Sequence, residues 1–187
     1  VMYINVYGCS RWGYNDDGRA TPPDEPFRAL GFGSYNACGV TEAGRGVCWG
    51  SNDWGQSSPP DVAMTAIDGG SFYSCGISEA ADLLCWGQDE HGAISDVPAG
   101  SFTAVSAGQA HICALRQDQT LACWGSDARG RLDHPEGSFR TVAAGVESSC
   151  ALNLDDELVC WGMMSTSLTA VAAFSLGNGF GLSLIHI

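Results

Sequence analysis

The chain contains no lysine. Its eight arginines face 21 aspartates and glutamates, which gives a formal net charge of −13 over 187 residues. Proteins that bind nucleic acid place clustered basic side chains against the phosphates. The arginines do not cluster here, since Arg129 and Arg131 are flanked by Asp127 and Asp133. We therefore expect no nucleic-acid partner and no binding to an anionic membrane.

Long apolar runs and catalytic motifs are also missing. No run of 18 apolar residues occurs, so we expect no membrane insertion. The sequence has no Gly-x-Ser-x-Gly elbow, no phosphate-binding loop and no His-Glu-x-x-His motif. Before the last six residues, histidine occurs only at His91, His111 and His134. We therefore expect no catalytic residues and no cofactor, and we do not expect an enzyme.

Cysteine, by contrast, is abundant and regularly placed. Eight of the nine cysteines form four pairs, each with a separation of ten residues, and each second cysteine begins the tripeptide Cys-Trp-Gly. The pairs follow one another at intervals of 37, 38 and 37 residues: Cys38 and Cys48, Cys75 and Cys85, Cys113 and Cys123, Cys150 and Cys160. Repeats of this length are typical of solenoids, propellers and other arrays.

The repeat divides the chain. Four complete repeats cover 27–63, 64–101, 102–138 and 139–167, and half repeats cover 1–26 and 168–181. In this alignment Leu168 takes the place of Phe27. Residues 1–181 thus form one predicted domain. The last six residues, 182–187, resemble a translated sequencing adaptor, so we leave them out of the predicted fold.

The local pattern is that of short strands. Apolar segments of four to seven residues are bounded by Gly, Pro, Asp and Ser, without a helical period. A hairpin with a loop of odd length, left-handed at Gly44 in the first copy, would place the two cysteines of each pair opposite one another, at a distance that a disulfide spans. Buried free thiols and a zinc site are the alternatives; zinc lacks the usual Cys-x-x-Cys spacing.

Disulfides would place the protein in an oxidising compartment, extracellular or at the cell surface, with a signal peptide upstream of the given sequence. Each bridge would close a loop of about 11 residues. Cys9 has no partner at the expected spacing, and we expect its partner further upstream.

One repeat carries a family resemblance. Its residues 107–115 read Ala-Gly-Gln-Ala-His-Ile-Cys-Ala-Leu, and residues 123–125 read Cys-Trp-Gly. This resembles the short bacterial form of the regulator-of-chromosome-condensation repeat. The resemblance implies an all-β propeller with four-stranded blades, commonly seven in a ring. The family histidine, His111 here, is replaced by Asn36, Tyr73 and Ser148 in the other copies, which indicates a structural position.

The chain is too short for the seven blades that are common in this family. Seven blades of about 37 residues need more than the 187 available. We therefore expect four complete blades and two half blades, a fragment of a seven-bladed ring. A closed five-bladed ring is the alternative; against it, the connection from Trp161 to Leu168 is shorter than that from Trp124 to Phe139.

A turn follows each Trp-Gly dipeptide in the first four copies. Its second residue is Asn15, Asn52, Asp89 or Asp127. Asn and Asp cap their own backbone in turns, which explains the pattern without the alternating carboxylates of a calcium loop. We therefore predict no metal site. The residue before the turn glycine changes from copy to copy, and we predict that these residues contact a partner: Asp17, Trp54, His91 and Arg129. Unconstrained solvent-exposed positions are the alternative.

Two functions follow from different classes. The first is a secreted or cell-surface module that binds an unidentified protein partner through loops at the blade rim. The alternative, by family analogy, is a guanine-nucleotide exchange factor for a small GTPase. Paired cysteines favour the first, since an intracellular exchange factor is expected to carry reduced thiols.

Overall fold

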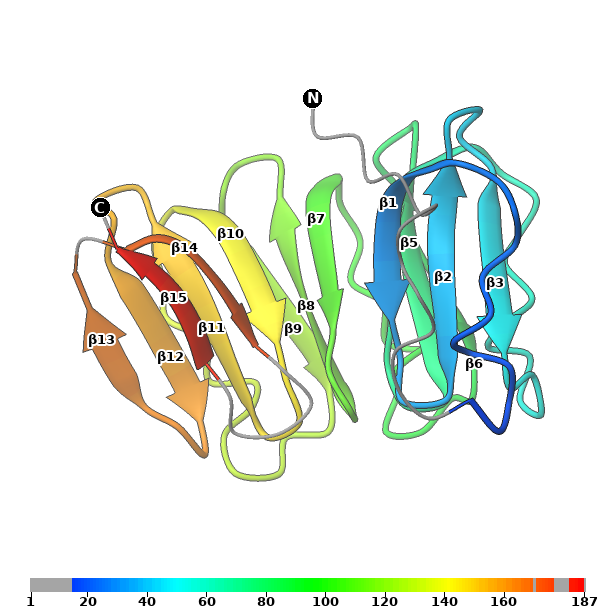
Figure 1. Cartoon of the computed structure of the whole chain (residues 1–187). Helices are drawn as coiled ribbons and strands as arrows, with labels where there is room; N and C mark the ends of the chain where they lie inside the picture. Colours follow the sequence, from blue (N-terminus) through cyan, green and yellow to red (C-terminus); the bar gives the residue numbers. More distant parts are fainter. Residues whose placement is uncertain (1–14, 170, 177–181, 187) are drawn as a thin grey trace.

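The computed structural model describes residues 15–169, 171–176 and 182–186 of the chain (Figure 1). These residues form β-strands and turns, without a helix. The strands are β1 (Phe27–Phe32), β2 (Asn36–Thr41), β3 (Gly46–Gly50), β4 (Met64–Gly69), β5 (Tyr73–Ser78), β6 (Leu83–Gly87), β7 (Phe102–Ala107), β8 (His111–Arg116), β9 (Leu121–Gly125), β10 (Phe139–Ala144), β11 (Ser148–Asn153), β12 (Leu158–Gly162), β13 (Thr166–Leu168), β14 (Val171–Leu176) and β15 (Leu182–His186).

Each complete repeat folds into one antiparallel sheet. The sheets are β1-β2-β3, β4-β5-β6, β7-β8-β9 and β10-β11-β12-β13, followed by β14-β15. In Figure 1 these sheets succeed one another in chain order, as the blades of a propeller do. The all-β propeller architecture is confirmed. The number of blades in a complete ring stays a prediction.

Successive sheets pack through their first strands. The first strand of each later sheet contacts the first and second strands of the sheet before it, as β4 does with β1 and β2. The backbones come so close that a Cβ atom on Gly31 would lie 2.4 Å from the Cα of Asp68. Apolar side chains of neighbouring sheets fill the space between them, with Tyr73 and Phe102 in one shared cluster.

The four predicted hairpins and disulfides are confirmed. The paired cysteines lie directly opposite one another, with Cα–Cα distances of 4.0–4.2 Å. The loop is odd in length, since Val40 pairs with Gly46 across five residues. Gly44 is left-handed, with φ of 82°. The other copies hold non-glycine residues in this conformation: Ala81, Gln119 and Asp156.

The fourth strand of the blade differs from expectation. Only the fourth sheet, among the described residues, has one, and it is the three-residue strand β13. In the first repeat a single bridge between Arg45 and Ala63 stands in its place. The longer connections of the first three repeats leave the outer strand to form turns instead.

The predicted start of the last half repeat was three residues early. Leu168 ends β13, and Val171 takes the position of Met64: the Val171 carbonyl accepts from Arg140, as the Met64 carbonyl accepts from Arg28. Residues 182–186, left out of the predicted fold, pair with β14 as β15. Their proposed adaptor origin stays a prediction. Cys9 lies outside the described residues.

Candidate functional site

One edge of the sheets gathers two sets of loops, which we call the turn rim. It comprises the turns after the Trp-Gly dipeptides (15–18, 52–55, 89–92 and 127–130) and the loops between the first two strands of each sheet (33–35, 70–72, 108–110 and 145–147). The last three of these turns are each tied to the loop beside them: the Ser51 N–H donates to the Tyr35 carbonyl at 2.9 Å, the Gln88 N–H to the Phe72 carbonyl at 2.8 Å and the Ser126 N–H to the Ala110 carbonyl at 2.8 Å. In Figure 1 the arrowheads of β1, β3 and β12 point to this edge, at the bottom.

The Asn or Asp at the second position of each turn caps the turn itself. Its side-chain oxygen accepts a hydrogen bond from the backbone N–H five residues later. For example, Asn52 accepts from the Ser57 N–H at 2.9 Å, and Asp89 accepts from the Ile94 N–H at 2.8 Å. Asn15 and Asp127 make the equivalent bonds. These bonds account for the repeated residue type. In the described part of the chain no three His, Cys, Asp or Glu side chains are placed to hold a metal ion.

The tryptophan of each Cys-Trp-Gly fixes a turn of the preceding repeat. Its indole N–H donates to the carbonyl of the residue after the turn glycine, about 30 residues earlier, at 2.8–3.1 Å. The donor and acceptor pairs are Trp49 and Arg19, Trp86 and Gln56, Trp124 and Ala93, Trp161 and Arg131. A strand of one sheet thus holds the rim turn that lies before it.

The turn that carries Trp54 is braced most fully. Gln56 is fully buried; its Oε1 accepts from the Trp54 N–H at 2.9 Å, and its Nε2 donates to Ser51 Oγ at 3.1 Å. Ser57 Oγ donates to the Ser51 carbonyl at 2.7 Å. The Trp54 side chain nevertheless stays 55% exposed. The repeat alignment singled out Trp54 but not Gln56, which holds it in place.

Two further aromatic rings extend this part of the rim. Tyr35 and Phe72 stack with 4.8 Å between ring centres and 12° between ring planes. The Arg19 guanidinium lies 5.5 Å from the centre of the Tyr35 ring and donates to the Ser34 carbonyl. We call Tyr35, Trp54 and Phe72 the aromatic half of the turn rim. Neither Tyr35 nor Phe72 was predicted, because they follow no repeated motif.

The fourth sheet carries a different, ionic surface on the same rim. Glu147 occupies the position in the fourth repeat that Tyr35 occupies in the first. Its carboxylate accepts a hydrogen bond from Arg129 at 2.6 Å. Arg129 also contacts the sulfur of Met163, and Arg131 lies 3.8 Å from Glu147. Arg129 therefore has partners within the chain, although its side chain remains half exposed.

The four predicted contact residues thus lie on one rim, but in separate turns. Asp17 lies 3.8 Å from Arg19, and His91 lies 3.6 Å from the carboxylate of Glu90. Trp54 belongs to the aromatic half and Arg129 to the ionic surface. Partner binding by these residues stays a prediction.

The position of the family histidine is structural in each of the first three sheets. Asn36 donates to Ser74 Oγ at 2.9 Å, Tyr73 donates to the Gly108 carbonyl at 2.8 Å, and His111 Nε2 lies 2.7 Å from Ser149 Oγ. Each of these bonds crosses to the next sheet. Burial, and secondarily the charge of Arg131, lowers the pKa of His111 to about 4, so the ring is neutral at physiological pH.

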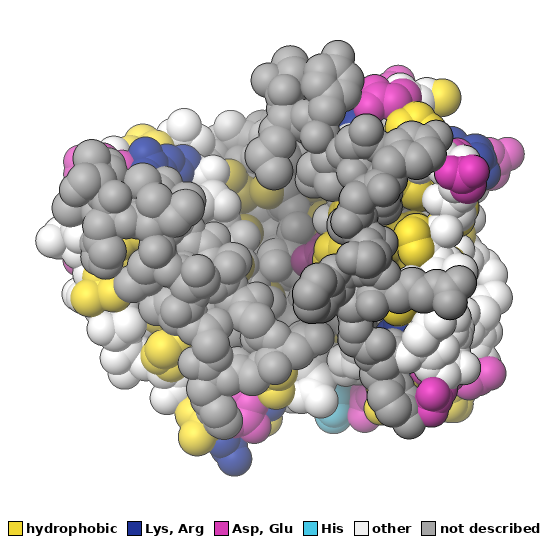
Figure 2. All heavy atoms as spheres, viewed as in Figure 1, with side chains coloured by type: hydrophobic (Ala, Val, Ile, Leu, Met, Phe, Trp, Pro, Cys, Tyr) yellow, Lys and Arg dark blue, Asp and Glu magenta, His cyan; other side chains and the backbone are white. Residues whose placement is uncertain are grey.

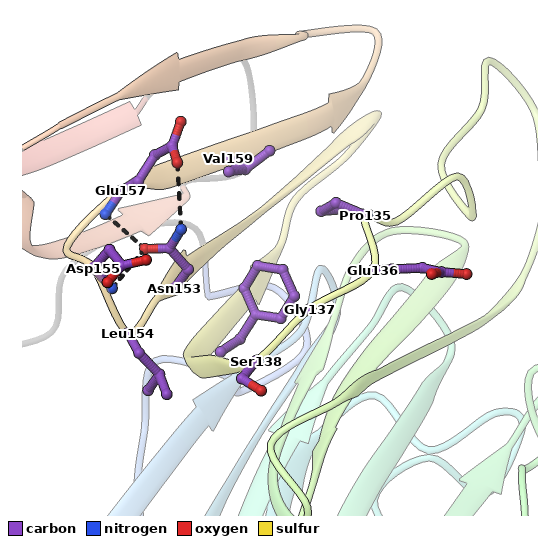
Figure 3. Close-up of a pocket in the computed structure, with 10 residues that line it drawn as sticks. Pro135, Glu136, Gly137, Ser138, Asn153, Leu154, Asp155, Glu157 and Val159 are labelled. Carbon is purple, nitrogen blue, oxygen red and sulfur yellow. Dashed lines mark hydrogen bonds between the residues drawn. The ribbon is translucent and has the colours of Figure 1, made fainter.

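An open pocket of about 460 Å³ lies on the opposite rim (Figure 3). Its walls are the connection 135–138 and the β11–β12 hairpin. The Asn153 side chain stabilises the hairpin loop, because its Oδ1 accepts hydrogen bonds from the backbone N–H groups of Asp155 and Glu157. Leu154 beside them is 52% exposed. No motif or spacing in the sequence indicated this pocket.

Charge is spread thinly over the surface. In the view of Figure 2 acidic side chains lie at several places along the edges and in the central hollow, and the basic side chains are spread among them. Among the described residues no helix is long and apolar enough to span a membrane.

Several known proteins are similar to this chain in sequence or in fold. Residues 102–131 match the family model of the regulator of chromosome condensation (RCC1) repeat. No curated protein sequence matches the chain. The ectodomain of the receptor kinase CR4 from Physcomitrella patens is 30% identical, with a TM-score of 0.72 over 84% of this chain and 47% of that one. The CRINKLY WD40 ectodomain of the Arabidopsis thaliana receptor kinase ACR4 is 27% identical, with a TM-score of 0.66 over 75% of this chain and 52% of that one.

The yeast protein Prp20p, from Saccharomyces cerevisiae, shares the fold. It is 16% identical, with a TM-score of 0.72 over 89% of this chain and 57% of that one. The chain thus spans about half of the length of these proteins. The class is that of disulfide-bonded β-propellers. The regulator-of-chromosome-condensation repeat that the resemblance implied is confirmed at residues 102–131, and Prp20p has the same fold.

Proposed function

We propose that the chain is part of an extracellular propeller that binds a protein partner through its turn rim, with Trp54 as the central contact. The four disulfides support an oxidising compartment. The likeness to two plant receptor ectodomains supports a position outside the cell. The bacterial source that the repeat type implied stays a prediction.

The observation that carries the proposal is the exposure of Trp54 on a fixed turn. An exposed tryptophan is unfavourable in water, whereas tryptophan is enriched among the residues that dominate protein interfaces. The Trp54 N–H donates to Gln56 Oε1, and Ser57 Oγ closes the same turn by donating to the Ser51 carbonyl, so the turn is ordered before any partner arrives. Pre-ordering of this kind lowers the entropic cost of binding.

Nucleotide exchange, the alternative, has weaker support. Prp20p binds Gsp1p and histones, but at 16% identity its likeness to this chain supports a shared fold alone. Binding is therefore the function that we propose.

The test is capture of a partner by matched variants. The chain, secreted in oxidised form, is cross-linked in extracellular fluid from its source, and the captured proteins are quantified by mass spectrometry. Trp54→Ala is expected to reduce retention of the specific partner by about 30-fold or more, as for a residue that dominates an interface. Leu154→Ala removes an apolar side chain of similar exposure, 52%, from the opposite rim and is expected to retain the partner.

Folding is checked separately, because a misfolded variant would also lose the partner. Trp54→Ala should keep all four disulfides and the wild-type unfolding midpoint, since the turn is held through the Trp54 backbone. Equal retention by Trp54→Ala and wild type, or loss only with Leu154→Ala, would overturn the proposal.

A further inference from the structure

We infer that the aromatic half of the turn rim binds an arginine or lysine side chain, presented by an extended basic segment of the partner and received by Trp54 and Asp53. This inference rests on the proposed function, because it names the chemistry of the partner at the same rim. Three features carry it: the charge of the rim, the exposed ring of Trp54, and contacts of the same kind inside the chain.

The charge around the aromatic half is negative. Asp16, Asp17 and Asp53 are all exposed in the two turns beside it. The basic side chain between these turns, Arg19, already lies near Asp17 and over Tyr35. Asp53 has its polar contact with Ser51 Oγ, a long one at 3.4 Å. The surface therefore favours a cation over an anion or a neutral side chain.

Trp54 supplies the other half of such a site. Its side chain follows Asp53 directly in the chain and is 55% exposed. Among the aromatic residues, the tryptophan ring attracts a cation most strongly through its negative face. Asp53 and Trp54 are consecutive exposed residues of one turn, and in the proposed complex both attractions act on the same cation.

The chain itself already contains this pairing. The Arg19 guanidinium carbon lies 5.5 Å from the centre of Tyr35, and that of Arg116 lies 5.0 Å from the centre of Phe102. The first of these contacts is on the turn rim itself. It shows that a guanidinium packs on an aromatic ring in this part of the surface, where a carboxylate of Asp17 lies close by.

An extended segment is the form of partner that fits. The aromatic half runs across two sheets, since Tyr35 precedes β2 and Phe72 precedes β5. The turn with Trp54 begins at the Tyr35 carbonyl and ends beside β5, where Ser74 Oγ donates to the Gln56 carbonyl. A row of rings across neighbouring blades offers successive contacts to a chain that lies across them.

The test uses two defined peptides on the folded, oxidised chain. The probe is an acetylated and amidated peptide that alternates arginine and glycine, and its counterpart replaces every arginine by glutamate. Binding is measured by isothermal titration calorimetry and by the shifts of the indole N–H signals in NMR. We expect the arginine peptide to bind and the glutamate peptide not to bind.

The variants separate a local site from general attraction to an acidic protein. Trp54→Ala is expected to weaken the arginine peptide at least fivefold, and Asp53→Asn about two- to fivefold, as cation–π and exposed ion pairs allow. The chain offers a matched control on the opposite rim, where exposed Leu154 is followed by exposed Asp155. Leu154→Ala and Asp155→Asn are expected to leave the affinity unchanged.

Each outcome decides. Equal affinity in all four variants, screened by salt to the same extent, would show attraction by net charge alone and overturn the inference. Binding of the glutamate peptide at the same rim would also overturn it. If Trp54→Ala abolishes binding of the protein partner but leaves the affinity for the arginine peptide unchanged, the proposed function is supported and the inference of a basic segment is wrong.

Discussion

The carboxylate of Asp68, at the inner side of the second sheet, accepts a hydrogen bond from the backbone N–H of Ala107 in the third sheet at 2.9 Å. Ser106 Oγ donates to the same carboxylate oxygen at 3.3 Å and accepts in turn from the Ala144 N–H of the fourth sheet at 3.1 Å. Three successive blades are thus joined through two side chains. Although Asp68 as a residue is only partly buried, its carboxylate is enclosed by neighbouring backbones.

Asp68 makes the stability of the protein depend on pH. Burial outweighs its hydrogen bonds and raises its pKa from 3.8 to about 6. The folded state therefore binds this proton more tightly than the unfolded state does. Its contribution to stability is complete below pH 3.8 and is lost as the pH rises through about 6, a difference of about 3 kcal/mol in all. Asp68→Ser, which copies the residue at the equivalent position in the third sheet, should remove this dependence in urea unfolding measured from about pH 4 to 7.5.

His111 acts in the opposite direction. Its pKa falls from 6.5 to about 4, so the unfolded state binds this proton more tightly. The contribution of His111 is complete above pH 6.5 and is lost as the pH falls through about 4, again about 3 kcal/mol. His111→Asn, which copies Asn36 and its bond to a serine of the next sheet, should remove that loss.

The two terms oppose each other between about pH 4 and 6. We expect the wild-type free energy of unfolding to change little from these two groups in this interval. The Asp68→Ser variant should lose stability on acidification, and the His111→Asn variant should gain it. A pair of variants with parallel pH profiles would contradict both assignments.

The sequence predicted those features that depend on local chemistry. Opposed cysteines ten residues apart require a hairpin with an odd loop, and Asn52 and Asp89 cap the turns that their position indicated. The register of the last half repeat was missed because Leu168 and Val171 are both apolar, and what distinguishes them are tertiary contacts such as the hydrogen bonds of the Val171 carbonyl with Arg140 and of its N–H with the Asp156 carbonyl.

The sequence predicted the single residues of the candidate site but not the contacts between sheets. A residue that changes between copies, such as Trp54, is visible in an alignment of repeats. The stack of Tyr35 on Phe72 depends on how two sheets are placed side by side, which local patterns do not specify. The same holds for Glu147, which lies 18 residues from Arg129 in the chain but meets it in space.

The indole hydrogen bonds should differ in their contribution to stability. The Gln56 carbonyl accepts from Trp86 at 2.9 Å and also from Asn36 and Ser74, so Trp86→Phe leaves it satisfied. The Arg131 carbonyl, among the described residues, has its bond from Trp161 at 2.8 Å. We expect Trp86→Phe to cost about 1 kcal/mol and Trp161→Phe about 2–3 kcal/mol, because the second change leaves a buried acceptor without a donor. Chemical unfolding of the two variants measures the difference; equal costs would contradict this account.

The four disulfides should differ in how readily they are reduced. Cys160 is 4% exposed on β12, where β13 pairs alongside it, whereas Cys48, Cys85 and Cys123 lie partly exposed on strands that have no such neighbouring strand in the described structure. A thiolate must reach a sulfur atom to open a bridge, so access controls the rate. Under mild reductant, with alkylation and mass spectrometry as the readout, the Cys150–Cys160 bridge should open last.

A change in β13 tests this explanation directly. Thr166→Pro removes the N–H of the β13 residue directly opposite Cys160, which lies in a hydrogen-bonded pair of the β12–β13 ladder, and so interferes with pairing to β12. The Cys150–Cys160 bridge should then be reduced at a rate similar to that of the other three, while their rates stay as in the wild type.

Loss of any one bridge removes the constraint on a loop of about 11 residues and should lower the free energy of unfolding by about 3 kcal/mol. If the fourth bridge still opened last in the Thr166→Pro variant, protection by β13 would not be the cause, and a slower opening of the β11–β12 hairpin as a whole would have to explain the slow reduction.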